Sequence, residues 1–255
     1  MRCFFFGTGG RQLYGALHPA ESVRTRSTAV VLAYPSLFEF NASHAAFRRL
    51  ASLLERAGFP TLRFDYSGMG DSEGAPTESF CRDWAVDIAT ACHELSALSR
   101  ARNICVVGLR IGATLAVQAS SLTALDQLVL WEPVLSGQRY LEQLEQLDRR
   151  QRITRLYPRP APRDELLGFS FSQAHRAELA RLNVMPMSVP DGTGVSIVAP
   201  SSWPELPALT SKFPGAHLET FTRTEAMVDA TDQSGMLSME PLRAIVRSIE
   251  RLEVA

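Results

Sequence analysis

One short stretch of the chain has the pattern of a turn that presents a catalytic side chain. Residues 104–116, ICVVGLRIGATLA, run from apolar residues through Gly108, Arg110 and Gly112 into small helix-forming residues. This is the strand–turn–helix pattern of the G-x-S-x-G motif, in which the central residue is a serine nucleophile. Arg110 cannot be a nucleophile, because its guanidinium stays protonated. It could instead bind a carboxylate, a phosphate or a developing oxyanion, or it could pair with a carboxylate and fill the pocket.

A serine hydrolase also needs an acid that follows a later strand. After the apolar run VSIVAP the chain offers Ser202 but no aspartate. Glu132 follows the apolar run LDQLVLW, and Glu225 follows the last such run. Glu132 is therefore expected to lie beside Arg110, either as its ion-pair partner or as a general base. Glu225 is a second candidate for both roles, and Glu39 is a weaker candidate for the counter-charge.

The third requirement is a histidine in the loop after the last strand, and the sequence has none there. The five histidines are His18, His44, His93, His175 and His217. His44 could approach from the start of the first helix, and His175 from the middle of the chain, but a surface or core role is expected for each. The expected places therefore supply no Ser–His–acid triad.

Residues 34–38, YPSLF, stand where a loop could supply N–H groups to an oxyanion. The backbone N–H groups of Leu37 and Ile111 could converge on a ligand oxygen. Ser36 could donate a hydrogen bond or act as an alternative nucleophile, although a turn serine is the simpler interpretation. The residues expected to contact a ligand are Tyr34, Leu37, Phe38, Ile111 and Ser202.

These side chains need a framework, and the alternation of apolar runs predicts it. Strands are expected over residues 3–6, 11–20, 27–35, 60–68, 103–108, 125–133, 193–200 and 216–222. Helices are expected over residues 43–58, 77–99, 111–122, 204–215 and 238–252. Strands that alternate with helices of this length predict an α/β fold, with a mostly parallel sheet covered by helices on both faces.

The alternation stops after Pro133. Residues 137–187 hold two helix-like stretches joined by the proline-rich run YPRPAPR, and strand patterns resume after them. We therefore predict a core of residues 1–136 and 188–255, with a helical lid of residues 137–187 inserted after the sixth crossover strand.

Three stretches carry a resemblance to a known family: YPSLFEFNASHAAFRRLA, LRFDYSGMGDSEG and GLRIGATLA. Over nearly its full length the chain resembles α/β hydrolases. It is most similar to the serine-hydrolase-like proteins associated with exosortase gene clusters and with acyl-metabolising pathways. The resemblance implies an esterase- or thioesterase-like site and a small acyl, ester or thioester ligand, free or bound to a carrier. The second stretch is the most specific, and the third would be a weak match by itself.

Two functions follow from these residues. The chain could be a non-covalent hydrolase or lyase in which Arg110 acts as the electrophile and Glu132 or Glu225 as the general base. Alternatively, it could be a pseudohydrolase that uses the old pocket only to bind an acyl carrier or a pathway partner. The predicted lid and the cation at position 110 favour a pocket that holds a ligand, whereas the loss of both the acid and the histidine argues against hydrolysis.

Composition sets further limits. With 45% hydrophobic and 21% charged residues the chain is expected to fold, and a net charge of −1 gives no reason to expect a nucleic-acid partner. No apolar run is long enough for a membrane span or a signal peptide, so we expect a cytoplasmic protein. The four cysteines have no C-x-x-C spacing, and Cys92 and Cys105 are expected to be buried free thiols. No phosphate-binding, zinc or calcium motif predicts a cofactor or a metal.

Overall fold

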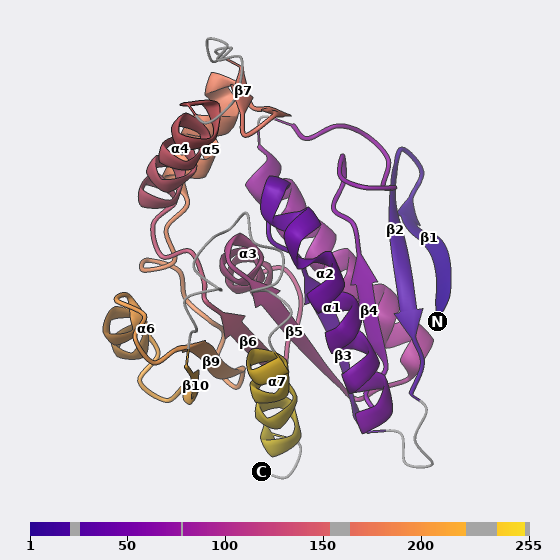
Figure 1. Ribbon diagram of the computed structural model, residues 1–255. Coiled ribbons are helices and arrows are strands. Elements are labelled where there is room, and N and C mark those ends of the chain that lie inside the picture. Colours follow the sequence, from indigo (N-terminus) through magenta and orange to yellow (C-terminus); the bar gives the residue numbers. More distant parts are fainter. Residues whose placement is uncertain (21–25, 78, 154–163, 223–238, 253–255) are drawn as a thin grey trace.

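A mixed β-sheet forms the centre of the computed structural model (Figure 1). The structure describes residues 1–20, 26–77, 79–153, 164–222 and 239–252. The strands of this sheet are β1 (Arg2–Thr8), β2 (Arg11–His18), β3 (Thr28–Ala33), β4 (Thr61–Phe64), β5 (Asn103–Leu109), β6 (Gln127–Trp131), β9 (Gly194–Pro200) and β10 (His217–Phe221). All eight correspond to strands that the sequence predicts.

The strand order is β1-β2-β4-β3-β5-β6-β9-β10. β2 pairs antiparallel with both β1 and β4, and every other pair in the sheet is parallel. The central strands β3 and β6 are buried along their whole length, as expected for parallel strands that helices cover on both faces. The predicted fold class, a mostly parallel sheet with crossover helices, is confirmed.

In the described ranges, helices flank the sheet on both sides. They are α1 (Leu37–Ala57), α2 (Phe80–Ser99), α3 (Ile111–Ala119), α6 (Leu206–Lys212) and α7 (Met239–Leu252). β4 lies on one side of β3 in the sheet, and β5 lies on the other side. The connections from β3 to β4 and from β4 to β5 therefore run in opposite directions across the sheet. Because parallel crossovers are right-handed, α1 and α2 cover opposite faces. α1 packs against α7, and α2 packs against α3.

The predicted start of the first helix, at residue 43, is wrong. α1 begins at Leu37, directly after Ser36, whose extended backbone (φ −90°, ψ 161°) forms the N-cap. Residues 37–42 therefore belong to the helix and not to a loop. As a consequence, Glu39 lies in the first turn of α1, at the end of β3.

The predicted lid, residues 137–187, contains α4 (Gly137–Ile153), α5 (Gln173–Arg181) and a short hairpin of β7 (Glu165–Leu166) and β8 (Phe169–Ser170). The hairpin strands are too short to leave a pattern in the sequence. Figure 1 shows α4 and α5 side by side, on the opposite side of the molecule from β1 and β2. Arg176 on α5 and Glu145 on α4 form an ion pair at 2.6 Å. A lid function for this segment remains a prediction.

Burial agrees with the expectations for the cysteines. Cys81, Cys92 and Cys105 are buried free thiols, and Cys3 is exposed on β1. Among the described helices, none combines the length and the apolar character that a bilayer crossing requires.

Candidate functional site

The sheet topology brings three predicted site residues together at the carboxyl ends of neighbouring strands. The strand order reverses between β3 and β5, and ligands of open α/β sheets bind in the crevice at the carboxyl ends of the strands at such a point. Ser36 follows β3, Arg110 follows β5, and Glu132 follows β6. Leu109 and Trp131, the residues just before the last two, are paired in the sheet. Arg110 and Glu132 are therefore neighbours, as the sequence predicts.

Arg110 lies in the sharp strand-to-helix turn that the motif predicts. Its backbone has φ 55° and ψ −120°, a conformation that costs a residue other than glycine about 1–3 kcal/mol. The turn is held by hydrogen bonds: the Arg110 N–H donates to the Trp131 carbonyl at 3.0 Å, and the Ala113 N–H donates to the Arg110 carbonyl at 3.1 Å. The prediction that Arg110 lies in a sharp turn between a strand and a helix is confirmed by this geometry.

The two glycines of the motif are required by close backbone contacts. A Cβ atom on Gly112 would lie 2.3 Å from the carbonyl oxygen of Tyr34, and one on Gly108 would lie 2.5 Å from the backbone of Ala113. Only a residue without a side chain lets α3 approach the ends of β3 and β5 this closely.

The guanidinium of Arg110 reaches two acceptors at the carboxyl ends of the central strands. Its Nε donates to Oε1 of Glu39 at 3.4 Å, and its Nη1 donates to the backbone carbonyl oxygen of Glu132, also at 3.4 Å. The Glu39 carboxylate is 9% exposed and the Arg110 side chain 20% exposed, so this is a largely buried ion pair. The expectation that Glu132 is the ion-pair partner is wrong: within the described residues, Glu39 is the partner. The physical reason is the early start of α1, which places Glu39 above the elbow.

The environment keeps Arg110 charged. Burial acts to lower the pKa of its guanidinium, but the negative charge of Glu39, with further contributions from Tyr140 and Glu132, raises that pKa above its usual value. Position 110, in the turn between β5 and α3, therefore holds a permanent cation.

Tyr140, on α4 of the predicted lid, completes the arrangement. Its hydroxyl donates a hydrogen bond to Oε2 of Glu39, and its ring lies 5.3 Å from Cζ of Arg110 in a cation–π contact. The hydroxyl of Ser36 is also buried, and its influence acts to lower the pKa of the Tyr140 phenol. Burial, and then the charge of Glu39, raise the pKa of Tyr140 well above 10.0, so the phenol stays a hydrogen-bond donor. We call Ser36, Glu39, Arg110 and Tyr140 the elbow cluster.

The sequence does not indicate Tyr140 as a site residue, and it offers Glu39 only as a weaker candidate for the counter-charge of Arg110. Tyr140 lies three residues into a predicted helix, and nothing in its spacing distinguishes it from a packing residue. The one available signal is its place at the start of the inserted segment, close in sequence to the end of β6.

The other predicted ligand contacts are arranged differently. Leu37 and Ile111 are the first residues of α1 and α3, so their N–H groups have no partner within their own helices. The side chain of Tyr34 lies in the core instead, 1% exposed, where its hydroxyl accepts a hydrogen bond from Nη1 of Arg63 at 3.1 Å. Burial raises the pKa of Tyr34. An oxyanion hole between the two helix starts remains a prediction.

Three further candidates lie apart from the elbow cluster or beyond the described structure. Ser202 lies in the exposed turn after β9. Glu225 and the side chain of Phe38 lie outside the described residues.

Neither histidine considered at the sequence level belongs to the elbow cluster. His44 faces Tyr34 in a stacked arrangement at 6.2 Å between ring centroids, and burial lowers its pKa. His175 contacts the backbone carbonyl of Pro76 at 3.3 Å and forms a capping box with Ser172 at the start of α5. The expected packing roles of both histidines agree with these contacts.

The elbow cluster can recognise a ligand oxygen, but it lacks the parts of a covalent relay. It contains one cation, one carboxylate and two hydroxyl groups. The guanidinium makes two described hydrogen bonds, both at 3.4 Å, and it carries further N–H donors suited to a carbonyl or a carboxylate. No histidine follows His217 in the sequence, so the loop that would carry a catalytic histidine has none.

The fold is that of the α/β hydrolases. DcsB, solved in complex with its substrate analogue, is 16% identical with a TM-score of 0.67, over 100% of this chain and 99% of that one. An esterase from Pyrococcus furiosus, PF2001, is 14% identical with a TM-score of 0.68, over 99% and 91%. XC6422 from Xanthomonas campestris, an α/β serine hydrolase without a lid, is 12% identical with a TM-score of 0.65, over 98% and 94%. No protein-family model and no curated protein sequence matches the chain.

Proposed function

We propose that this chain is a pseudohydrolase: a protein with the α/β-hydrolase fold that binds an acyl, ester or thioester ligand, free or bound to a carrier, and does not hydrolyse it. One observation carries the proposal. The nucleophile position holds Arg110, which is paired with Glu39 and covered by the ring of Tyr140. These groups bind charge and hydrogen-bond donors or acceptors, and none of them is an activated nucleophile.

Several features support an acyl ligand. The spare N–H donors of Arg110 and the first amides of α1 and α3 are suited to a carbonyl oxygen. DcsB binds a substrate analogue, and another structure of this fold, Est1E from Butyrivibrio proteoclasticus, binds ferulic acid. The sequence resemblance to proteins found with exosortase gene clusters and acyl-metabolising pathways points to the same ligand class.

A non-covalent hydrolase or lyase is the second candidate. The observation that favours it is the position of Glu132, directly beside the elbow, with a charge close enough to raise the pKa of Arg110. In that case Arg110 would stabilise a developing oxyanion, and Glu132 would act as the general base.

Butyryl-CoA and decanoyl-CoA separate these functions. Binding is measured by calorimetry, and turnover by chromatographic detection of free CoA. A pseudohydrolase binds at least one thioester without releasing CoA above the blank. Replacing Arg110 with Met should weaken that binding by about tenfold, the loss expected for one charge-assisted hydrogen bond. Arg139→Met, at an exposed position on α4, is the matched control and should bind like the wild type.

Two outcomes would overturn the proposal. CoA release that disappears in both Arg110→Met and Glu132→Gln would establish the second candidate instead. Failure of every thioester to bind, or binding that Arg110→Met leaves unchanged, would remove the elbow cluster from the function altogether.

A further inference from the structure

The elbow cluster already contains a carboxylate that is bound to its cation. Nε of Arg110 donates to Oε1 of Glu39 at 3.4 Å, and the Tyr140 hydroxyl donates to the other carboxylate oxygen, Oε2. Both oxygens of Glu39 are therefore bound by donors of the cluster, as the oxygens of a free carboxylic acid would be. The positive charge of Arg110 is balanced before any ligand arrives.

Arg110 is the member of the cluster that a ligand can reach. Its side chain is 20% exposed, whereas Ser36, Glu39 and Tyr140 are buried. Nη1 makes a hydrogen bond of 3.4 Å with the carbonyl oxygen of Glu132, and the guanidinium has more N–H groups than these two acceptors use. A ligand oxygen at the elbow therefore meets N–H donors of Arg110 that lie close to the Glu39 carboxylate.

The charge of Glu39 decides which kind of oxygen binds there. The carbonyl oxygen of an ester or thioester accepts a hydrogen bond without bringing a net charge. A carboxylate brings a second negative charge close to Glu39, and like charges repel strongly where protein replaces water. The charge of Glu132 acts on the same guanidinium and adds to this repulsion. The N–H donors fit either oxygen, but the charges favour the neutral one.

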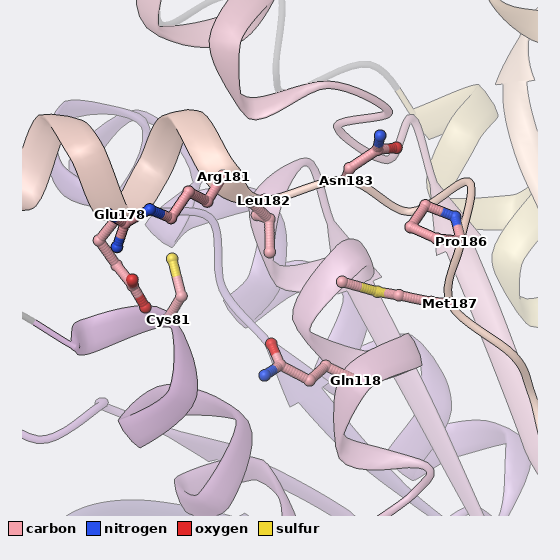
Figure 2. Close-up of a pocket in the computed structure, with 8 residues that line it drawn as sticks. All are labelled: Cys81, Gln118, Glu178, Arg181, Leu182, Asn183, Pro186 and Met187. Carbon is pink, nitrogen blue, oxygen red and sulfur yellow. The ribbon is translucent and has the colours of Figure 1, made fainter.

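A second pocket has a different arrangement of charges. It has a volume of about 340 Å³ and lies between the core helices α2 and α3 and the predicted lid (Figure 2). Glu178 and Arg181, one turn apart on α5, both line it, and no residue of the elbow cluster does. Glu178 is only partly buried and Arg181 is exposed, so water screens both charges. This pocket therefore provides a comparison in which removing a carboxylate should matter little.

We propose that Glu39 is a specificity-determining residue. It makes the elbow select an intact ester or thioester over the carboxylate that hydrolysis of the same ester would give. The inference rests on the proposed function, because it requires that an acyl ligand binds at Arg110. A protein with this selectivity holds an acyl group only while that group is esterified.

The test uses methyl hexanoate and hexanoate, which share an acyl chain and differ in charge at neutral pH. The protein is labelled with ¹⁵N at its three tryptophan side chains, and the Trp131 signal is assigned from a Trp131→Phe variant. Trp131 is a suitable reporter because its carbonyl accepts a hydrogen bond from the Arg110 N–H. Methyl hexanoate should shift the Trp131 signal to saturation, and hexanoate should need about tenfold higher concentration or more.

Hexanoate that binds as tightly as the ester would overturn the inference and leave the proposed function intact. A Trp131 signal that neither probe moves would also overturn the inference. The proposed function is decided separately, by the thioester titrations of the wild type and Arg110→Met.

Variants assign the selectivity to one carboxylate. Glu39→Gln removes the charge and keeps the shape of the side chain, so hexanoate should bind about tenfold more tightly than it binds the wild type. Methyl hexanoate should change by less than about threefold, because it carries no charge. Glu178→Gln, in the pocket of Figure 2, is the matched control and should keep the wild-type preference.

A preference for the ester that Glu39→Gln leaves unchanged would overturn the inference. Loss of that preference in Glu178→Gln would place the acyl group in the second pocket and would overturn it as well. If Glu39→Gln does not fold, the comparison of the two probes on the wild type decides by itself.

Discussion

The guanidinium of Arg110 and the carboxylate of Glu39 meet at 3.4 Å although 71 positions separate them in the chain. The sheet makes this possible, because β3 and β5 are neighbours and α1 and α3 both begin at their carboxyl ends. A largely buried cation without a counter-charge would cost several kcal/mol. An arginine at the elbow is therefore compatible with the fold because Glu39 and Tyr140 accompany it.

Glu39→Gln should destabilise the protein by about 2–3 kcal/mol, because it leaves the Arg110 cation without its partner in a largely buried place. Urea unfolding followed by circular dichroism measures the change. Glu142→Gln, at an exposed position on α4, is the control and should stay within about 0.5 kcal/mol of the wild type.

The double variant Glu39→Gln/Arg110→Met adds a check on the mechanism. Removing the cation as well should recover much of the lost stability, since an apolar replacement for a buried ion pair is often neutral. A single Glu39→Gln variant as stable as the wild type would show that the ion pair does not hold the elbow.

The phenol of Tyr140 predicts a loss of stability at alkaline pH. Its pKa in the folded state is raised well above 10.0 by burial and then by Glu39, and burial also raises the pKa of Tyr66 well above that value. The stabilisation that follows is complete below pH 10.0, the unfolded value, and is lost as the pH rises from there toward the folded pKa. Each such phenol lowers the free energy of unfolding by about 1.4 kcal/mol per pH unit in that window.

Urea unfolding at a series of pH values above 10.0, for the wild type and Tyr140→Phe, measures this slope. The variant should lose stability less steeply with pH, by the contribution of one phenol, and phenolate absorbance of the wild type should rise together with unfolding. Equal slopes for the two proteins would contradict a strongly raised pKa at Tyr140.

The sequence predicts the framework well because periodicity reports directly on burial. The eight strands and the long helices are present, and the Gly108–Gly112 turn has the expected shape. Close backbone contacts require glycine at both positions, so the spacing of the two glycines in the sequence indicates the turn. The apolar spacing of the first helix is clear only from residue 43 onward, so the sequence does not reveal that α1 begins at Leu37.

The site is less predictable because its contacts join distant segments. Glu132 follows a strand next to the elbow, so spacing favours it, yet the contact made there is with its backbone carbonyl. Glu39 and Tyr140 depend on where α1 begins and on how α4 packs, and neither property is encoded by local spacing. The positions that directly follow strand ends, Arg110, Glu132 and Ser36, could be placed from the sequence, but the ion-pair partner of Arg110 could not.

The elbow should not react as a serine hydrolase, even after a serine is restored. We expect no labelling of the wild type by a fluorophosphonate probe, and no ester hydrolysis above the blank by Arg110→Ser, because the chain has no histidine after His217 to activate the hydroxyl. Mass spectrometry of the treated protein measures labelling. Stoichiometric labelling of the wild type that disappears in Ser36→Ala or Ser202→Ala would instead locate a nucleophile outside the elbow.

Gly112→Ala should be the most damaging single-methyl change in the elbow. Its Cβ would lie 2.3 Å from the carbonyl oxygen of Tyr34. Neither atom can rotate away, because the backbone fixes the position of both, so α3 has to move away from β3. We expect a loss of about 3 kcal/mol or more, at the upper end of the cost of overpacking. Gly9→Ala, in an open turn where a Cβ would meet no atom within 4 Å, should change stability by less than about 0.5 kcal/mol. Urea unfolding of the two variants beside the wild type gives the comparison.

Equal stability of Gly112→Ala and Gly9→Ala would contradict this prediction. It would mean that the fold does not require the close approach of α3 to the end of β3, the geometry that places Arg110 beside Glu39.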